Sequence, residues 1–225
     1  MIFDPMYFIM LAPGLLLAAV AQMMVKSTFA KYSKVASYSK MTGAQAAERM
    51  LHSSGVYDVT VEQVQGFLSD HYDPSRKALR LSPDVYQSNS LAAVGIACHE
   101  AGHALQHAAG YMPLTLRTLL VPVTQLSSNL AVYVFLAGMV LNVQSLALVG
   151  CAMFAVAFLF SVVTLPVEWD ASARAKQHIA LAGVVSPSQE RDAGRVLNAA
   201  FLTYVAGAVA SLMTLLYFLM RANRR

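Results

Sequence analysis

The stretch GIACHEAGHALQHAAG, residues 95–110, places three histidines and one glutamate close together in the chain. Side chains four residues apart lie on the same face of a helix, so His99 and His103 can reach one metal ion. Glu100 follows the first of these histidines and can direct its carboxylate at a water molecule beside that ion. The alternative is an ordinary buried helix, but buried polar groups cost free energy unless they are paired or bind a metal.

The spacing is the H-E-x-x-H pattern of zinc metalloproteases, in which Zn²⁺ acidifies a water molecule and the glutamate accepts its proton. A catalytic zinc site generally has three protein ligands, and two residues are candidates for the third. His107 continues the i+4 series, but a helix rotates it by about 80° from His99. Glu168 follows Pro166 at the end of an apolar run. The rotation favours Glu168 as the ligand and a packing role for His107.

The composition indicates a membrane protein. Of the 225 residues, 57% are hydrophobic and 12% are charged, whereas soluble domains contain about 25% charged residues. Four apolar runs are long enough to cross a bilayer core of about 30 Å. These runs cover residues 5–25, 119–141, 145–165 and 199–220.

The apolar runs divide the chain into five parts. The predicted parts are a transmembrane anchor (1–25), a catalytic segment (26–118), a transmembrane hairpin (119–165), a segment with the third ligand (166–198), and a final transmembrane helix with a basic tail (199–225). Because the hairpin returns the chain to the side that it left, both polar segments are expected on one side of the membrane. Residues near 100 can therefore meet residues near 170.

The formal charge of +4 is interpreted as a signal of membrane topology, with no nucleic acid as a partner. Four lysines follow the first apolar run: Lys26, Lys31, Lys34 and Lys40. The positive-inside bias then predicts a multi-pass protein of the cell membrane whose active site faces the cytoplasm. The tail residues Arg221, Arg224 and Arg225 favour the opposite orientation.

Within the catalytic segment, residues 42–55 predict a short helix with Thr42 as its N-cap and Gly55 as its end. Residues 56–64 and 77–82 predict strands, with a turn at 72–76. The strand at 77–82 is expected to offer an open edge to an extended peptide. Residues 91–109 predict a helix that begins after Ser88 or Asn89 and ends at Gly110.

The predicted fold is therefore mainly α: a multi-span membrane protein with about four transmembrane helices and a small α+β, zincin-like catalytic portion. The site requires Zn²⁺ as its cofactor, the lipid bilayer as its setting and a protein or peptide as its substrate.

Four stretches together resemble the bacterial YugP-like neutral zinc metallopeptidases: GIACHEAGHALQHAAGYMPLTLR, LSDHYDPSRKALRLSPDVY, PVEWDASARA and RVLNAAFLTYVA. The chain is more distantly similar to gluzincins of the HtpX and CAAX-protease type, which combine H-E-x-x-H with a later E-x-x-x-D. The resemblance implies zinc ligands at His99, His103 and Glu168 and a general base at Glu100. Ser172 stands where that pattern has its aspartate. Asp170 lies on another helix face, so Ser172 or an acid from residues 69–73 is the expected substitute.

A peptidase also needs a donor to the developing oxyanion. His71 and Tyr204 are the predicted catalytic residues for this role, with Tyr72 and Arg174 as further candidates. The favoured hypothesis is a membrane-bound zinc endopeptidase, a hydrolase that acts on membrane or membrane-adjacent proteins. A non-catalytic zinc-binding protein is the alternative. An intramembrane site-2-type protease is less favoured, because the last three apolar runs contain no Asp or Glu.

Overall fold

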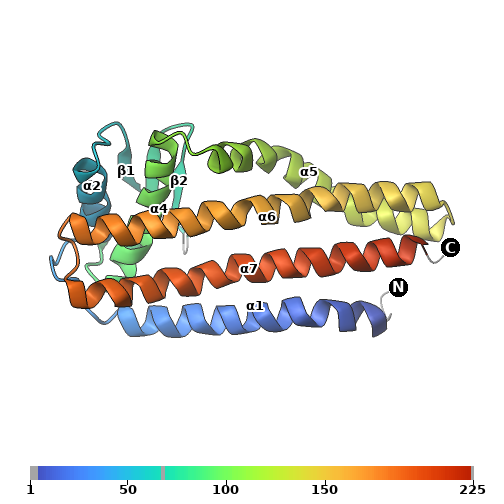
Figure 1. Ribbon diagram of the computed structural model, residues 1–225, viewed down its shortest axis with the longest axis horizontal. Helices are drawn as coiled ribbons and strands as arrows, with labels where there is room; N and C mark the ends of the chain where they lie inside the picture. The colour runs from blue at the N-terminus through green and yellow to red at the C-terminus, as the bar shows by residue number, and fades with distance from the viewer. Residues whose placement is uncertain (1–4, 67–68, 224–225) are drawn as a thin grey trace. The chain divides into compact units, whose positions relative to one another are not determined.

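The computed structural model describes residues 5–66 and 69–223, and Figure 1 labels most of the helices and strands. The chain divides into two compact units. The first, here called the helical unit, comprises Met1–Ala21, Thr115–Pro166 and Leu202–Arg225, and the second, the mixed unit, comprises Gln22–Leu114 and Val167–Phe201. Arg224 and Arg225 of the predicted basic tail lie outside the described residues, as do residues 1–4 and 67–68.

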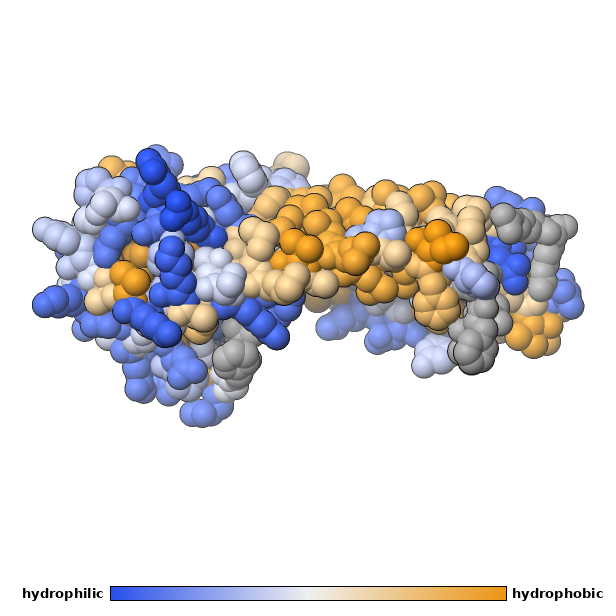
Figure 2. Space-filling model, turned by 90° about the horizontal axis from the view of Figure 1, so that it is seen from below, coloured by the Kyte–Doolittle hydropathy of each residue, from blue (hydrophilic) through white to orange (hydrophobic). Residues whose placement is uncertain are grey.

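Four helices are long and apolar enough to cross a membrane, which confirms the predicted number of candidate spans. They are α1 (Pro5–Tyr32), α5 (Met112–Val140), α6 (Gln144–Leu181) and α7 (Pro187–Asn223). In Figure 2, hydrophobic side chains cover much of the surface formed by these long helices. All four helices extend beyond the predicted apolar runs. The end of α1, the first residues of α5, the last part of α6 and the start of α7 belong to the mixed unit.

Small residues let α5 and α6 approach closely within the helical unit. A Cβ added to Gly138 would lie 2.3 Å from the backbone nitrogen of Ala147, and one added to Gly150 would lie 2.5 Å from that of Phe135. Asn142, in the short connection, has a φ of 57°, a left-handed conformation that asparagine tolerates better than most residues. α5 and α6 therefore pack closely on either side of the short connection at 141–143.

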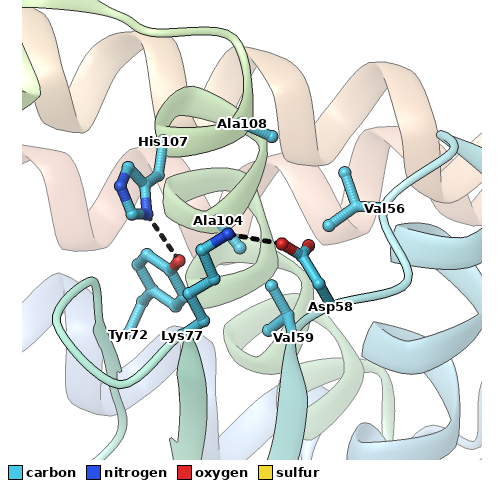
Figure 3. Close-up of a pocket in the computed structure, with 8 residues that line it drawn as sticks. All are labelled: Val56, Asp58, Val59, Tyr72, Lys77, Ala104, His107 and Ala108. Atoms are coloured by element: carbon cyan, nitrogen blue, oxygen red, sulfur yellow. Dashed lines mark hydrogen bonds and ion pairs between the residues drawn. The ribbon is translucent and has the colours of Figure 1, made fainter.

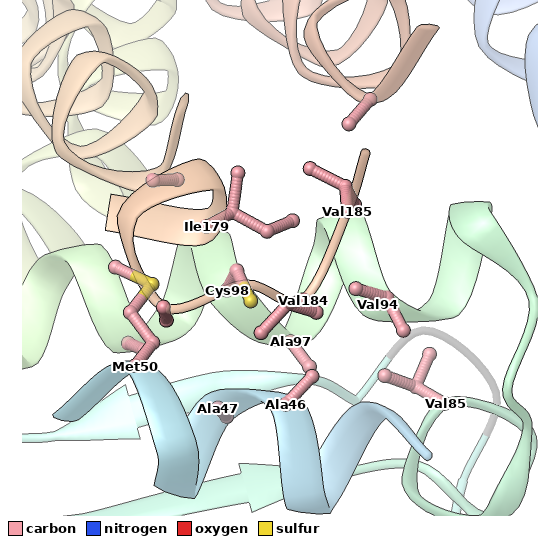
Figure 4. Close-up of a cluster of buried hydrophobic side chains, with 14 of the residues drawn as sticks. Ala46, Ala47, Met50, Val85, Val94, Ala97, Cys98, Ile179, Val184 and Val185 are labelled. Atoms are coloured by element: carbon pink, nitrogen blue, oxygen red, sulfur yellow. The ribbon is translucent and has the colours of Figure 1, made fainter. Parts of the chain in front are cut away.

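The mixed unit contains a small sheet and three further helices. Its elements are α2 (Gly43–Ser53), β1 (Thr60–Gln63), β2 (His71–Asp73), β3 (Ala78–Leu81), α3 (Pro83–Gln87) and α4 (Leu91–Ala108). Figure 4 shows part of its core, where Met50 of α2, Cys98 of α4 and Ile179 of α6 are almost completely buried. Burial of this apolar surface holds α2, α4 and the end of α6 together.

The sheet order corrects one prediction. β3 lies in the centre, parallel to β1 on one side and antiparallel to β2 on the other. The predicted open edge at residues 77–82 is therefore wrong, since both sides of this strand are already paired. The predicted turn at 72–76 is also partly wrong, because Tyr72 and Asp73 belong to β2 and pair with Leu79 and Ala78.

The ends of α2 agree with the sequence interpretation. The Thr42 hydroxyl accepts a hydrogen bond from the backbone of Gln45, whose side chain in turn caps the backbone N–H of Thr42. Gly55 follows the helix with a φ of 79°, which glycine adopts without strain. Both predicted boundary residues are confirmed.

The N-cap of α4 differs from the prediction. Ser90, and not Ser88 or Asn89, is the cap, and its hydroxyl accepts a hydrogen bond from the backbone N–H of Ala93 at 3.2 Å. A one-turn helix, α3, precedes this position and displaces the start of α4 toward the C-terminus. Gly110 has a φ of 64° just after the helix, so the predicted end is confirmed.

Candidate metal centre

Helix α4 presents His99 and His103 on the same face. Their ring centroids are 5.0 Å apart and their planes make an angle of 80°. The His99 side chain is 13% exposed and that of His103 is 8% exposed. The i, i+4 spacing therefore produces two neighbouring imidazoles that are largely shielded from solvent. Helix α4 is not among the candidate spans of the described chain.

The third side chain, Glu168, comes from α6, two residues after Pro166. Its side chain is 1% exposed, and its Oε2 lies 3.1 Å from Nε2 of His99 and 3.7 Å from Nε2 of His103. His99 and Glu168 both belong to the mixed unit, although they are 69 positions apart in sequence. Folding thus brings together the three side chains that the sequence nominated as ligands.

The donor set fits Zn²⁺. Each of the three residues offers one ligand atom, and these atoms all lie within 4.8 Å of one another. Ligands about 2.0–2.1 Å from a tetrahedral zinc ion lie about 3.3 Å apart, and the two carboxylate–imidazole distances of 3.1 and 3.7 Å fall on either side of that value. Two imidazoles and one carboxylate also leave a fourth coordination position for water or substrate.

The outer ring nitrogens of both histidines have polar partners. Ser172, four residues after Glu168, has its Oγ 3.2 Å from Nδ1 of His99. Gln106 Oε1 lies 3.0 Å from Nδ1 of His103. Sequence reasoning missed Gln106, although its position three residues after His103 places it on a neighbouring part of the same helix face.

The acids at residues 69–73 make their described contacts elsewhere. Asp70 accepts hydrogen bonds from the backbone and hydroxyl of Ser82, and Asp73 accepts from Ser75. These contacts stabilise the turns around β2 and β3. The expected substitution by an acid of this segment is therefore not seen, whereas Ser172 makes the expected contact.

Acidic neighbours alter the electrostatics of His103. Burial disfavours its charged form, but a hydrogen bond that it donates to Glu168 and the charges of Glu100 and Glu168 outweigh that effect and raise its pKa. The surroundings of this ring are therefore negative, which also favours a bound cation. Glu100 is half-buried, next to His99 on α4.

The two predicted oxyanion donors lie in different parts of the chain. His71 is exposed on β2, with its Nδ1 2.7 Å from the backbone oxygen of Ser69, and it is not part of the three-residue cluster. Tyr204 lies on α7 in the helical unit. Arg174, a further candidate, forms an ion pair with Asp170 at 2.6 Å. The roles of His71 and Tyr204 stay predictions.

His107 points to a different contact, with Tyr72 of β2. The Tyr72 hydroxyl lies 2.8 Å from Nδ1 of His107, as Figure 3 shows. Burial, together with the nearby Asp58 and Asp73, raises the pKa of Tyr72 to about 12, so its phenol stays neutral. His107 therefore lies outside the cluster of candidate ligands, as the helix geometry predicted.

Tyr72 and His107 line a pocket of about 280 Å³. Ala104 and His107 form one wall, and they lie four and seven residues after Glu100. Because residues at these spacings share a helix face, the pocket continues the face of α4 that carries Glu100. Its other lining residues include Tyr72 and the ion pair of Lys77 with Asp58.

Span-length apolar helices, the H-E-x-x-H helix α4 and a cluster in which Glu168 of α6 joins His99 and His103 are the features of a membrane protein with a zinc-peptidase-type site. Residues 7–223 match the family described as "Putative neutral zinc metallopeptidase", and the chain belongs to this family. It is 48% identical over 200 residues to the "Putative membrane protease YugP" of Bacillus subtilis (strain 168), with 89% of each chain covered. These matches confirm the resemblance seen in the sequence. No solved structure matches the chain.

Proposed function

We propose that the protein is a membrane-bound zinc-dependent endopeptidase that hydrolyses peptide bonds in membrane or membrane-adjacent proteins. The observation that carries this proposal is the convergence of His99, His103 and Glu168 beside Glu100. Membership of a zinc metallopeptidase family supports it, as does the similarity to a relative named as a membrane protease.

In the proposed mechanism, His99, His103 and Glu168 hold the zinc ion. When bound, zinc would polarise the scissile carbonyl and lower the pKa of a water molecule. Glu100 accepts a proton from this water while the water oxygen bonds to the carbonyl carbon. The carbon–nitrogen bond then breaks, and Glu100 returns the proton to the leaving nitrogen. The glutamate thus ends the cycle in its starting protonation state.

The oxyanion donor is assigned to His71 or Tyr204 as part of the same proposal. Tyr72 is a third candidate because its pKa is raised to about 12, so its phenol keeps its proton at neutral pH. Replacing each of the two tyrosines by phenylalanine and His71 by alanine would distinguish them. The true donor should lower kcat by about 100-fold or more, since a single oxyanion donor is worth that much in other hydrolases.

We further propose that the mixed unit faces the cytoplasm. The lysines after the first apolar run support this orientation, in accordance with the positive-inside bias. With an even number of spans, the C-terminus would then lie outside the cell membrane. Topology reporters fused to the C-terminus test this, and a cytoplasmic reporter signal would contradict the orientation without affecting the chemistry.

The decisive experiment compares Glu100→Gln with the wild type in the full-length, detergent-purified protein. Zinc content is measured together with the hydrolysis of fluorescently labelled casein and of a labelled membrane-protein mixture. The substitution should retain zinc and reduce hydrolysis by about 10²–10⁴-fold, the usual contribution of general acid–base catalysis. The exposed Glu48 supplies a matched control, because Glu48→Gln removes a carboxylate from the surface of α2.

The same experiment separates the alternatives. A wild type that binds zinc but hydrolyses neither substrate would favour a non-catalytic zinc-binding protein. A wild type without zinc affinity would contradict the proposal altogether. Selective cleavage within the apolar spans of the membrane-protein mixture would favour an intramembrane protease. This last outcome is not expected, because α4 is not one of the candidate spans of the described chain.

A further inference from the structure

Gln106 is a fully buried polar residue whose side chain connects α4 to α6. Its exposure is 0%. The amide nitrogen donates hydrogen bonds to the backbone oxygen of Val167 at 2.7 Å and to Oδ2 of Asp170 at 2.9 Å. The amide oxygen lies 3.0 Å from Nδ1 of His103. Every polar atom of this side chain therefore has a partner in the mixed unit.

The partners determine which way the amide points. A backbone carbonyl and a carboxylate can only accept hydrogen bonds, so the NH₂ group of Gln106 must face Val167 and Asp170. A flipped amide would place its oxygen against both acceptor oxygens, and these two contacts would then be repulsive. Asp170 also forms an ion pair with Arg174, whose Nε lies 2.6 Å from the same Oδ2.

The amide in turn selects the tautomer of His103. Its oxygen can only accept, so Nδ1 of the ring must carry the proton that it receives. A neutral imidazole with a proton on Nδ1 has its free electron pair on Nε2. That nitrogen faces Oε2 of Glu168 at 3.7 Å, inside the candidate metal centre. The opposite tautomer would place a proton on the nitrogen that has to bind the metal.

Gln106 also acts on the turn of α6 that carries the third ligand. Val167 immediately precedes Glu168, and Asp170 follows it by two residues. Hydrogen bonds to both hold this turn against α4, so one side chain controls the ring state of one ligand and the position of another. Such outer partners typically change metal affinity by 10–100-fold in zinc sites.

We propose that Gln106 is a positioning residue that keeps His103 in its metal-binding tautomer, and that Asp170 fixes the orientation of the Gln106 amide. The inference rests on the proposed zinc site and deepens it. It assigns the orientation of His103 to the neutral amide of Gln106, which is hydrogen-bonded to the carboxylate of Asp170. The other histidine, His99, contacts Ser172 instead.

The test measures the zinc dissociation constant of the full-length protein by chelator competition. Gln106→Met keeps the length of the side chain but removes all three hydrogen bonds, and it should weaken zinc binding by about 10–100-fold. Asp170→Asn should have a smaller effect, because Val167 still holds the amide. Gln87→Met is the matched control: Gln87 is exposed on α3, and its substitution should leave zinc affinity unchanged.

A second variant distinguishes positioning from simple loss of packing. The double substitution Gln106→Glu with Asp170→Asn exchanges the amide and the carboxylate. The carboxylate at position 106 can still accept a hydrogen bond from His103 Nδ1–H. The amide at position 170 can donate a hydrogen bond to that carboxylate. The double variant should bind zinc more tightly than Gln106→Met. Nitrogen-15 spectra of histidine-labelled, zinc-loaded protein should show a protonated His103 Nδ1 in the wild type and in this double variant.

The outcomes separate this inference from the proposed function. A wild type that does not bind zinc contradicts the proposed function. A wild type that binds zinc, combined with unchanged affinity in a folded Gln106→Met variant, overturns the role of Gln106 alone. If Gln106→Met does not fold, a double variant that folds but binds zinc no better than His103→Ala also overturns it.

Discussion

Gly102 of α4 lies directly against the backbone of Ala171 on α6. A Cβ built on Gly102 would come within 2.4 Å of the Ala171 carbonyl oxygen, a distance that backbone atoms cannot relieve by a side-chain rotation. Gly102 immediately precedes His103, and Ala171 lies three residues after Glu168. The absence of a side chain at one position therefore allows the two ligand-bearing segments to meet.

This contact leaves no space for a methyl group at position 102. Gly102→Ala should force α4 and α6 apart, reduce zinc affinity and lower the free energy of unfolding by about 1–3 kcal/mol, as overpacking commonly does. Gly95→Ala is the control on the same helix, because its Cβ would meet only Val196 atoms at 3.9 Å. That control should be neutral or stabilising by about 0.5–1 kcal/mol. Thermal unfolding and zinc titration measure both effects; equal behaviour of the two variants would contradict the prediction.

Glu168→Gln tests the third ligand. The substitution preserves the shape of the side chain but replaces a charged oxygen donor with a neutral amide, which is a poor zinc ligand. Zinc affinity should fall by on the order of 100-fold or more, beyond the range for outer partners. Glu190→Gln is the control, since Glu190 is exposed on α7. Chelator competition gives the comparison, and wild-type affinity in Glu168→Gln would remove this residue from the ligand set.

Ser172→Ala tests the partner of His99. The hydroxyl of Ser172 lies 3.2 Å from His99 Nδ1 and the residue is 4% exposed, so its loss leaves the ring without this buried partner. Zinc affinity should fall by about tenfold, the lower end of the range for such partners. Ser188→Ala, at an exposed position of α7, should have no effect. Isothermal titration of both variants would decide, and identical affinities would show that Ser172 does not orient His99.

The thiol of Cys98, next to His99 in the sequence, should react slowly with alkylating reagents in the folded protein. Cys98 is completely buried, and burial raises its pKa from about 9 to about 12. In a Cys151→Ala background, iodoacetamide at pH 8 should modify the folded protein about 1000-fold more slowly than the unfolded protein, because far less thiolate is present. Fast modification of the folded protein would contradict the buried placement.

The same shift makes stability depend on pH in the alkaline range. The unfolded thiol ionises near pH 9 and the folded thiol only near pH 12, so the contribution of Cys98 to stability is complete below pH 9. It is lost as the pH rises from about 9 to about 12, because the unfolded state then releases its proton more readily. Cys98→Ala should reduce this alkaline loss in a series of thermal unfolding curves.

Local features of the fold could be predicted from the sequence because they depend on neighbouring residues. The four apolar helices, the capping of α2 by Thr42 and the end of α4 at Gly110 all follow from composition and short spacings. The order of the strands could not be predicted in this way. Whether β3 lies at an edge or in the centre depends on pairing with Thr60–Gln63 and His71–Asp73, and side-chain alternation does not encode the choice of neighbour.

The same distinction between local and long-range features applies to the candidate site. The sequence by itself determined the pairing of His99 with His103, because the helical repeat places residues four apart on one face whatever surrounds the helix. It also nominated Glu168 through the side of the membrane on which that residue emerges. Only the tertiary structure decided that Gln106 and Ser172 are the partners of the ring nitrogens. Those contacts arise where α4 packs against α6, and hydrogen bonds between distant segments depend on the packing of whole helices, which no local spacing specifies.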